Sequence, residues 1–178
     1  MRESRYGRGA GRVALVGVLA GMSLVFLYLS SLSPTAQLGI VAIAGLFPAG
    51  AVVSAGLGAG FFCYGAAGLL GLLLLPDKAN ALLYLIFFGL WPMVKSLLER
   101  LRSRAAEWIA KLAVFNAALT LCYVVLGELF LPFLPKALTA AWMVYAAGNA
   151  AFVVYDIGFS KLIAFYVARV DRVLRKAA

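Results

Sequence analysis

The stretch from Phe87 to Asn116, FFGLWPMVKSLLERLRSRAAEWIAKLAVFN, decides how the fold is predicted. It begins with apolar residues, is interrupted at Pro92, carries three arginines between residues 100 and 104, and becomes apolar again at Trp108. Lys and Arg are concentrated in the cytoplasmic loops of membrane proteins. A basic patch between two apolar runs therefore predicts a cytoplasmic loop that joins two transmembrane helices.

The composition of the whole chain agrees with a membrane protein. Of its 178 residues, 65% are hydrophobic and only 13% are charged, whereas a soluble domain is about half apolar and about a quarter charged. The net charge of +9 does not indicate a nucleic-acid partner, because the basic residues form short clusters between apolar runs. We expect an integral membrane protein whose residues 1–178 form a single transmembrane domain.

The apolar runs predict an all-α bundle of six transmembrane helices, since about 20 apolar residues cross a bilayer. The predicted spans cover residues 13–32, 37–55, 59–75, 80–98, 108–131 and 137–169. The first run is too long for a signal peptide, so we expect it to be retained. Pro48 predicts a kink in the second span, and Gly56–Gly60 predicts a tight turn after it. The sixth span is longer than the bilayer and should tilt or project from it.

The distribution of basic residues predicts the orientation. Six spans place the N-terminal, 100–104 and C-terminal arginine clusters on one side of the membrane, and only Lys78 and Lys136 of the 16 Lys and Arg residues fall on the other. The positive-inside rule then puts both termini in the cytoplasm. The 95–111 stretch also has helical spacing of its leucines, so an amphipathic segment there would anchor on lipid headgroups or dock a partner.

The polar residues within the last two spans fall on one face of each helix. In the fifth span the face holds Asn116, Thr120 and Tyr123. In the sixth span it holds Tyr145, Asn149, Phe152 and Asp156. Counting residues from the span ends places the two asparagines at similar depth. They would either form an interhelical hydrogen bond or contact a ligand.

Other polar groups extend this candidate site. Glu128 lies near the outer end of the fifth span, where it would stand with Tyr84 and Tyr123 at the mouth of an outward cavity, or face water at headgroup level. The break at Pro92, next to Trp91, would shape a pocket or aim a lysine at the interface.

Asp156 lies near the cytoplasmic boundary of its span. Lys95, Lys111 and Lys161 are at comparable depth, so we expect a structural charge pair between Asp156 and one of them.

The residue types argue against an enzyme. The chain has no His, and Cys63 and Cys122 fall in different apolar spans, where we expect them to be buried as small hydrophobic residues. Few acid–base pairs are possible within the spans, and no phosphate-binding glycine loop is present. We expect no catalytic site, no metal and no cofactor.

Pairs of small residues four apart would let helices pack closely. They are Gly17 and Gly21 in the first span, Ala55 and Ala59 around the glycine-rich stretch, and Ala67 and Gly71 in the third span.

The layout resembles the substrate-binding S component of energy-coupling factor (ECF) vitamin transporters. The resemblance rests on six spans in under 200 residues, cytoplasmic termini, a small-residue stripe on the first span and polar residues on late spans. The stretch LLLLPDKANALLYLIFFGLWPMVKSLLERL, residues 72–101, is also similar to bacterial membrane proteins allied to that group.

The resemblance implies a subunit that captures a vitamin-like solute from outside for ATP-driven uptake. The solute would contact late-span residues, here Tyr84, Trp91, Asn116, Thr120, Tyr123, Glu128, Tyr145 and Asn149. The family docks on a membrane coupling protein driven by two ATPases, through an Ala-x-x-x-Ala pair on spans one and three. Here Gly17 with Gly21 and Ala67 with Gly71 stand in those places. The alternative is a non-catalytic membrane scaffold or assembly protein.

Overall fold

Six helical segments of the protein are long and apolar enough to cross a membrane. The computed structural model describes residues 3–33, 35–124, 127 and 140–177, and within these ranges it contains helices and no strand. The candidate spans are Ala10–Leu32, Gln37–Ala55, Leu57–Leu74, Lys78–Leu98, Arg104–Val124 and Ala141–Arg169. The prediction of an all-α chain with six helices long and apolar enough to span a membrane is thereby confirmed for the described residues. The predicted ends at residues 131 and 137 lie outside the described residues.

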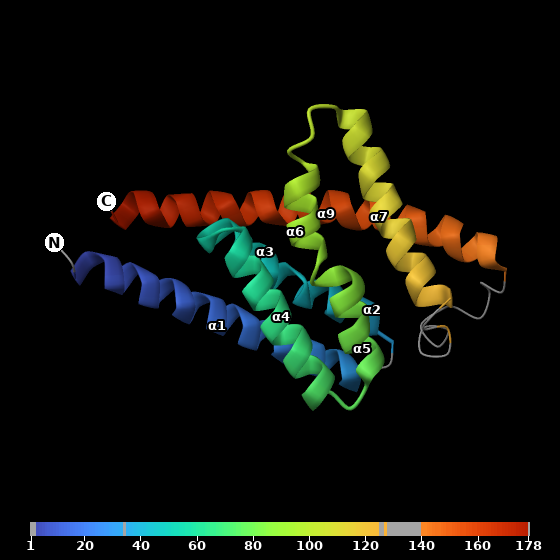
Figure 1. The fold of residues 1–178 in the computed structure, drawn as a ribbon, viewed down its shortest axis with the longest axis horizontal. Coiled ribbons are helices and arrows are strands. Elements are labelled where there is room, and N and C mark those ends of the chain that lie inside the picture. Colours follow the sequence, from blue (N-terminus) through green and yellow to red (C-terminus); the bar gives the residue numbers. More distant parts are fainter. Residues whose placement is uncertain (1–2, 34, 125–126, 128–139, 178) are drawn as a thin grey trace. The chain divides into compact units, whose positions relative to one another are not determined.

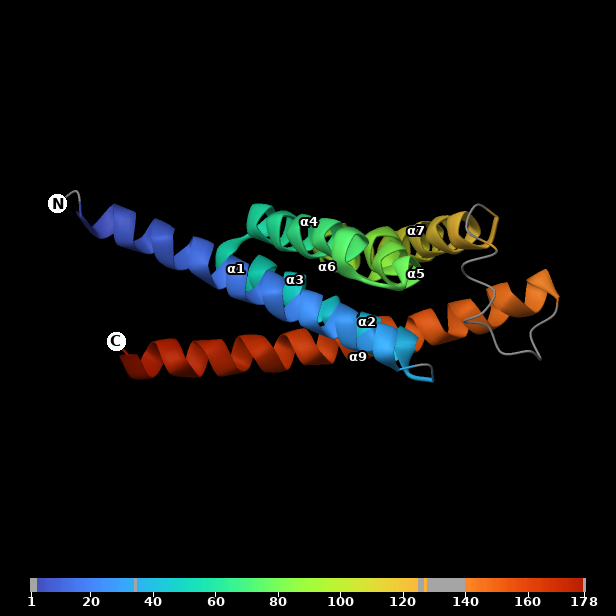
Figure 2. The same cartoon turned by 90° about the horizontal axis from the view of Figure 1, so that it is seen from below.

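The chain divides into two compact units, Met1–Ser103 and Arg104–Ala178, which are described separately. Unit 1 contains α1 (Glu3–Leu32), α2 (Gln37–Ala44), α3 (Leu46–Ala55), α4 (Leu57–Leu74), α5 (Lys78–Leu83), the π-helix η1 (Tyr84–Phe88) and α6 (Trp91–Leu98). Within it, α1 packs against α2, α3 and α4, and α4 packs against α3 and α5 (Figures 1 and 2). Unit 2 contains α7 (Arg104–Val124) and α9 (Ala141–Ala177), which pack against each other.

The second span is interrupted at Gly45, between α2 and α3, rather than kinked at Pro48 alone. Pro48 lies in the first turn of α3 and has no N–H to donate to the carbonyl of Ala44, four residues earlier. The hydroxyl of Ser23 on α1 donates to that carbonyl at 2.9 Å, and it lies 3.0 Å from the hydroxyl of Tyr84. A buried serine of another helix thus satisfies the carbonyl beside the break.

The glycine-rich stretch after α3 does not form the predicted five-residue turn. The turn is confined to Gly56, whose φ of +94° favours glycine, and α4 begins at the next residue. Gly60 is buried within α4, where an added Cβ would collide with the side chain of Val52 on α3. Gly60 therefore serves close helix packing, and Gly58 lies within α4 rather than in a turn, so hydropathy and turn propensity alone placed the helix start too late.

The fourth span contains the π-helix η1, immediately before the break at Pro92. The N–H of Gly89 donates to the carbonyl of Tyr84, five residues earlier, at 2.8 Å. The carbonyl of Leu85, which an α-helix would pair with Gly89, accepts a hydrogen bond from the hydroxyl of Tyr64 at 2.8 Å. Neighbouring helices thus satisfy backbone groups that the irregular segment leaves open, as a bilayer requires.

The charged stretch that follows is not one amphipathic helix, contrary to our expectation for residues 95–111. The helix α6 ends at Leu98 and α7 begins at Arg104, with turns and bends between them. Lys95 is buried at the end of α6 and pairs with Glu99 at 2.8 Å. The arginines at positions 100, 102 and 104 are exposed, so this segment presents charge from a loop rather than from a helical face.

Candidate functional site

The clearest arrangement of polar groups lies within unit 2, where α7 and α9 contact each other through a ladder of side-chain pairs. The rungs, in order along the helices, are Lys111–Asp156, Phe115–Phe152, Asn116–Asn149 and Thr120–Tyr145. Residue numbers rise along α7 while those of their partners fall along α9, because the two helices run antiparallel. The predicted polar faces of the last two spans therefore face each other.

The two asparagines form a reciprocal pair. Each amide nitrogen donates to the other residue's amide oxygen, at 2.9 and 3.0 Å, and each also donates to a carbonyl four residues earlier in its own helix, at 2.8 Å. An amide nitrogen has two N–H donors, and both are used in each residue. Of the two alternatives left by the sequence, the interhelical hydrogen bond is the one observed. A ligand could accept a hydrogen bond from either amide only if one of the existing hydrogen bonds were broken.

The next rung consists of hydroxyl groups and is more open. The hydroxyls of Thr120 and Tyr145 lie 2.8 Å apart, and Thr120 also donates to the carbonyl of Asn116 at 2.7 Å. Thr120 is exposed, and the ring of Tyr123 packs edge-on against that of Tyr145 with centroids 6.5 Å apart. These three side chains form the part of the ladder that a small polar molecule could reach without displacing an internal hydrogen bond between amides.

At the other end of the ladder lies a charged rung. The ammonium group of Lys111 is 2.9 Å from a carboxylate oxygen of Asp156 and 2.8 Å from one of Glu107, and it lies over the ring of Trp108. The predicted structural charge pair for Asp156 is confirmed, with Lys111 as its partner. Lys95 pairs with Glu99, and Lys161 is exposed.

Two other predicted solute-binding residues lie in unit 1 and are fully buried. Tyr84 has no exposed surface, and its ring packs directly on Gly89, where an added Cβ would come within 2.6 Å of it. Trp91 is 1% exposed and packs against Phe87 with ring centroids 5.3 Å apart. Both side chains contribute to packing around the π-helix. Glu128 lies outside the described residues.

The predicted docking residues divide into two pairs. Ala67 and Gly71 are buried within unit 1, and an added Cβ on Gly71 would contact Ala81 and Leu27 at 3.5 Å. Gly17 and Gly21 are exposed, with no atom within 4 Å of an added Cβ. Of the two pairs, only Gly17 and Gly21 on α1 are therefore exposed on the surface of unit 1.

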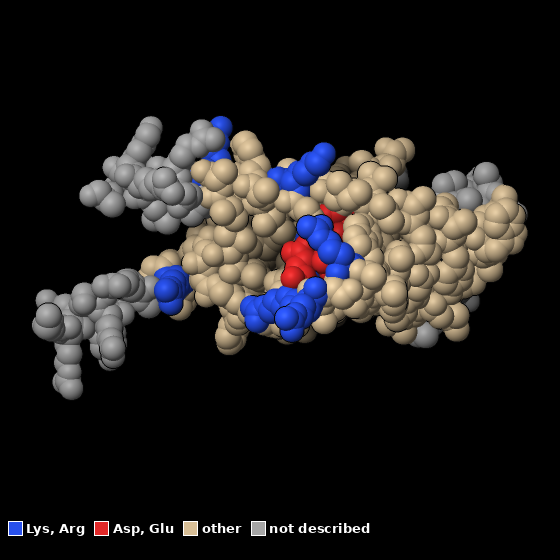
Figure 3. Space-filling view, turned by 90° about the horizontal axis from the view of Figure 1, so that it is seen from above, with Lys and Arg blue, Asp and Glu red and all other residues tan. Residues whose placement is uncertain are grey.

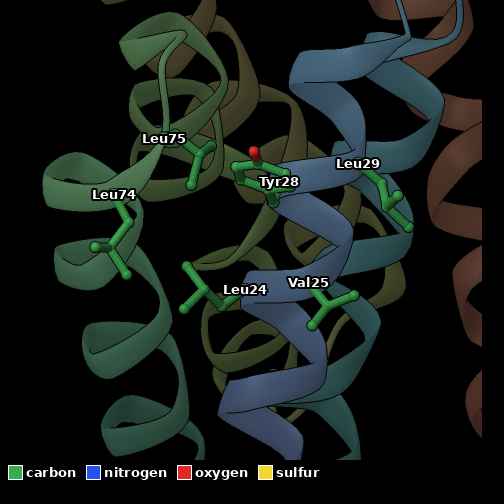
Figure 4. A pocket seen from close by; sticks show the side chains of 6 residues that line it. All are labelled: Leu24, Val25, Tyr28, Leu29, Leu74 and Leu75. Carbon is green, nitrogen blue, oxygen red and sulfur yellow. The ribbon is translucent and has the colours of Figure 1, made fainter.

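Unit 1 also carries two hollows on its surface. One, of about 420 Å³, is lined by Leu24, Val25, Tyr28, Leu29, Leu74 and Leu75. Figure 4 shows Leu24 and Leu74 directed into the space between α1 and α4, with the Tyr28 hydroxyl as the polar group among these six side chains. The other, of about 630 Å³, lies between α1, α3 and α4 and is named here the α1–α4 groove. Neither hollow is lined by the predicted solute-binding residues.

Charged groups are few on the described surface. Figure 3 shows that most of the visible face is neither basic nor acidic. Among the residues that the structure describes, no three His, Cys, Asp or Glu side chains come together in a way that could hold a metal ion. The two cysteines are buried and free, as the sequence predicted.

Two polar residues that form cross-helix hydrogen bonds in unit 1, Ser23 and Tyr64, were not predicted from the sequence. Each reaches a backbone carbonyl beside a helix irregularity on another helix. A serine in the middle of the first span was a usable signal, because isolated hydroxyls in membrane helices commonly bond across helices. The carbonyl that each hydroxyl reaches depends on tertiary packing and could not be predicted from the sequence.

Comparison of the chain with protein-family models, curated proteins and solved structures found no match. The fold and the ladder define a class: an all-helical, multi-pass membrane protein with a polar-paired helical hairpin in its C-terminal unit.

Proposed function

We propose that the protein is the substrate-binding membrane subunit of an ECF-type transporter, which captures a vitamin-like solute from outside the cell for ATP-driven uptake. It would act in the bacterial plasma membrane with both termini in the cytoplasm. It would not itself be an enzyme, and its partners would be a membrane coupling protein and two ATPases.

The observation that carries the proposal is the exposed hydroxyl rung, Thr120 with Tyr145. Thr120 lies 12 residues beyond Trp108, about 18 Å along the helix, and within the candidate span Arg104–Val124. Polar side chains at such depth usually face the protein interior or a solvated cavity. A solute-filled space beside this rung would account for hydroxyl groups that are exposed within the described structure.

The internal pairing of the asparagines narrows the proposed site. Because Asn116 and Asn149 already use all four amide N–H groups, we assign them to holding the hairpin together and Thr120, Tyr123 and Tyr145 to contacting the solute. Tyr84 and Trp91 would act by shaping unit 1. The open pair Gly17 and Gly21 is the part of the predicted docking surface that a coupling protein could reach.

Binding measurements on the purified full-length chain would test the proposal. A panel of vitamins and their precursors is screened by calorimetry, and any solute that binds is titrated into Thr120→Val, Tyr145→Phe and Tyr28→Phe variants. Loss of one hydrogen bond should weaken binding by about 3- to 10-fold in the first two variants. Tyr28→Phe removes a phenol hydroxyl from unit 1 and should leave affinity unchanged. Equal affinities in all variants would contradict the assigned site.

A non-catalytic scaffold or assembly protein is the second candidate. It is favoured by the fully paired asparagines and by the charged rung, which are what a purely structural hairpin requires. Mass spectrometry of material purified from the native membrane would separate the two functions. Co-elution of transporter ATPases and a small molecule supports the first, whereas other protein partners without a bound solute support the second.

A further inference from the structure

The α1–α4 groove has a charged end and an apolar body. It is lined by side chains of three helices, namely Arg12, Val13, Val16, Gly17, Ala20, Ala55, Gly58, Ala59, Phe62 and Ala66. Its volume of about 630 Å³ is within the roughly 300–1,000 Å³ typical of small-molecule sites. Arg12 is the one charged residue among them, so any occupant that uses the whole groove combines an anionic group with an apolar chain.

The groove runs along α1 and α4, two helices that we expect to cross the membrane, and therefore lies in the direction of a lipid acyl chain. On α1 it extends from Arg12 to Ala20 and on α4 from Gly58 to Ala66, which is eight residues, or about 12 Å, on each helix. Arg12 stands two residues inside the start of its candidate span, Ala10–Leu32. A guanidinium at the end of a span lies at the level of lipid headgroups and pairs readily with a phosphate.

Small residues keep the groove open. An added Cβ on Gly17 or on Gly58 would meet no atom within 4 Å, so both glycines border open space. Ala20, which lines the groove, is buried in a cluster with Ala51 and Cys63, and the lining residues Val16 and Ala59 pack against this cluster. Phe62 on α4 is 78% exposed and provides an apolar side wall.

From these features we infer that the α1–α4 groove binds one anionic phospholipid, with its phosphate on Arg12 and an acyl chain along Gly17 and Gly58. A docked transmembrane helix would cover a face of α1 that shares Gly17 with the groove but also includes Gly21. Helix pairing through small residues uses positions four apart on one helix, here Gly17 and Gly21, but Gly21 does not line the groove. A hollow between three helices, with a cation at its end, suits a thin flexible chain that carries a phosphate.

Native mass spectrometry of the full-length protein would test this inference. The protein is reconstituted with phosphatidylglycerol or with phosphatidylcholine of identical acyl chains, and the fraction retaining a lipid after collisional activation is measured. The wild type should retain phosphatidylglycerol in preference to phosphatidylcholine. Arg12→Gln should lower retention of phosphatidylglycerol by about fivefold, whereas Lys161→Gln, which removes an equal charge from α9, should not.

Two glycine variants test the location of the acyl chain. Gly17→Leu and Gly58→Leu would each place a side chain in the groove and should lower retention of phosphatidylglycerol at least tenfold. Gly21→Leu adds the same bulk on α1 outside the groove and should retain the lipid as the wild type does. Monodisperse elution and an unchanged helical circular dichroism spectrum verify folding, and Gly17→Ala replaces any leucine variant that fails this check.

Three outcomes would overturn the inference. One is equal retention of the two lipids by the wild type. Another is unchanged retention in folded Gly17 and Gly58 variants. The third is an equal loss in the Gly21→Leu variant, which would indicate that a protein helix covers this face of α1.

Discussion

Lys111 and Asp156 form a buried ion pair across the helical hairpin of unit 2, with the ammonium nitrogen 2.9 Å from a carboxylate oxygen and each residue 2% exposed. The two residues are 45 positions apart, yet they close the end of the ladder at which α7 begins. A second carboxylate, that of Glu107 on the preceding turn of α7, also contacts the lysine. The lysine is therefore shared between two carboxylates.

This arrangement predicts that replacing Lys111 and replacing Asp156 will destabilise the protein to different extents. Lys111→Met removes a cation that contacts a buried carboxylate and should destabilise the protein by about 3–5 kcal/mol. Asp156→Asn leaves the lysine paired with Glu107, so it should cost less. Combining the two substitutions should cost less than the sum of the single effects. Unfolding in denaturing detergent measures all three, and strict additivity would contradict a direct pair.

Removal of the Ser23 hydroxyl should destabilise the protein far more than removal of the Ser30 hydroxyl on the same helix. Ser23 reaches across from α1 to the Ala44 carbonyl that Pro48 cannot pair, whereas Ser30 donates to Leu27 of its own helix at 2.6 Å. Both serines are buried. Ser23→Ala leaves a carbonyl without a partner in an apolar setting and should cost about 1–3 kcal/mol. Ser30→Ala should change the free energy of unfolding by less than about 0.5 kcal/mol, and equal effects would refute the cross-helix role.

Gly45 and Gly39 offer a matched pair for testing the contact between the α2–α3 break and the π-helix. A Cβ on Gly45 would collide with the backbone carbonyl of Phe88, while a Cβ on Gly39 would meet nothing within 4 Å. Gly45→Ala should therefore destabilise the protein by about 1–3 kcal/mol. Gly39→Ala lies within α2 and should stabilise it by about 0.5–1 kcal/mol. A neutral Gly45→Ala, measured by the same unfolding assay, would argue against this close approach.

The spans were predictable because a bilayer imposes one dominant requirement, a long apolar helix. The second span matches the predicted residues 37–55, and the others agree within a few residues at the described ends. The breaks were harder to predict. Pro48 signalled an interruption, but its position at Gly45 depends on contacts with Phe88 and Ser23 from distant helices.

The polar ladder was predictable in part. Helical spacing and depth were enough to bring Asn116 and Asn149 together, because both properties follow from fixed helix geometry. Depth alone left three lysines as partners for Asp156, and only the packing of α7 on α9 selects Lys111. The π-helix had no sequence signal, since it depends on the hydroxyl of Tyr64 reaching the carbonyl of Leu85 from another helix.

We expect six helices to cross the membrane, with the arginine-rich segments on the cytoplasmic side. Paired reporter fusions in cells, one active only in the cytoplasm and one only outside, would test this expectation when placed after Arg104 and after Asp77. We expect a cytoplasmic signal at Arg104, the first residue of α7, and an exterior signal at Asp77, between α4 and α5. An exterior signal after Arg104 would contradict the orientation and, with it, the proposed solute site.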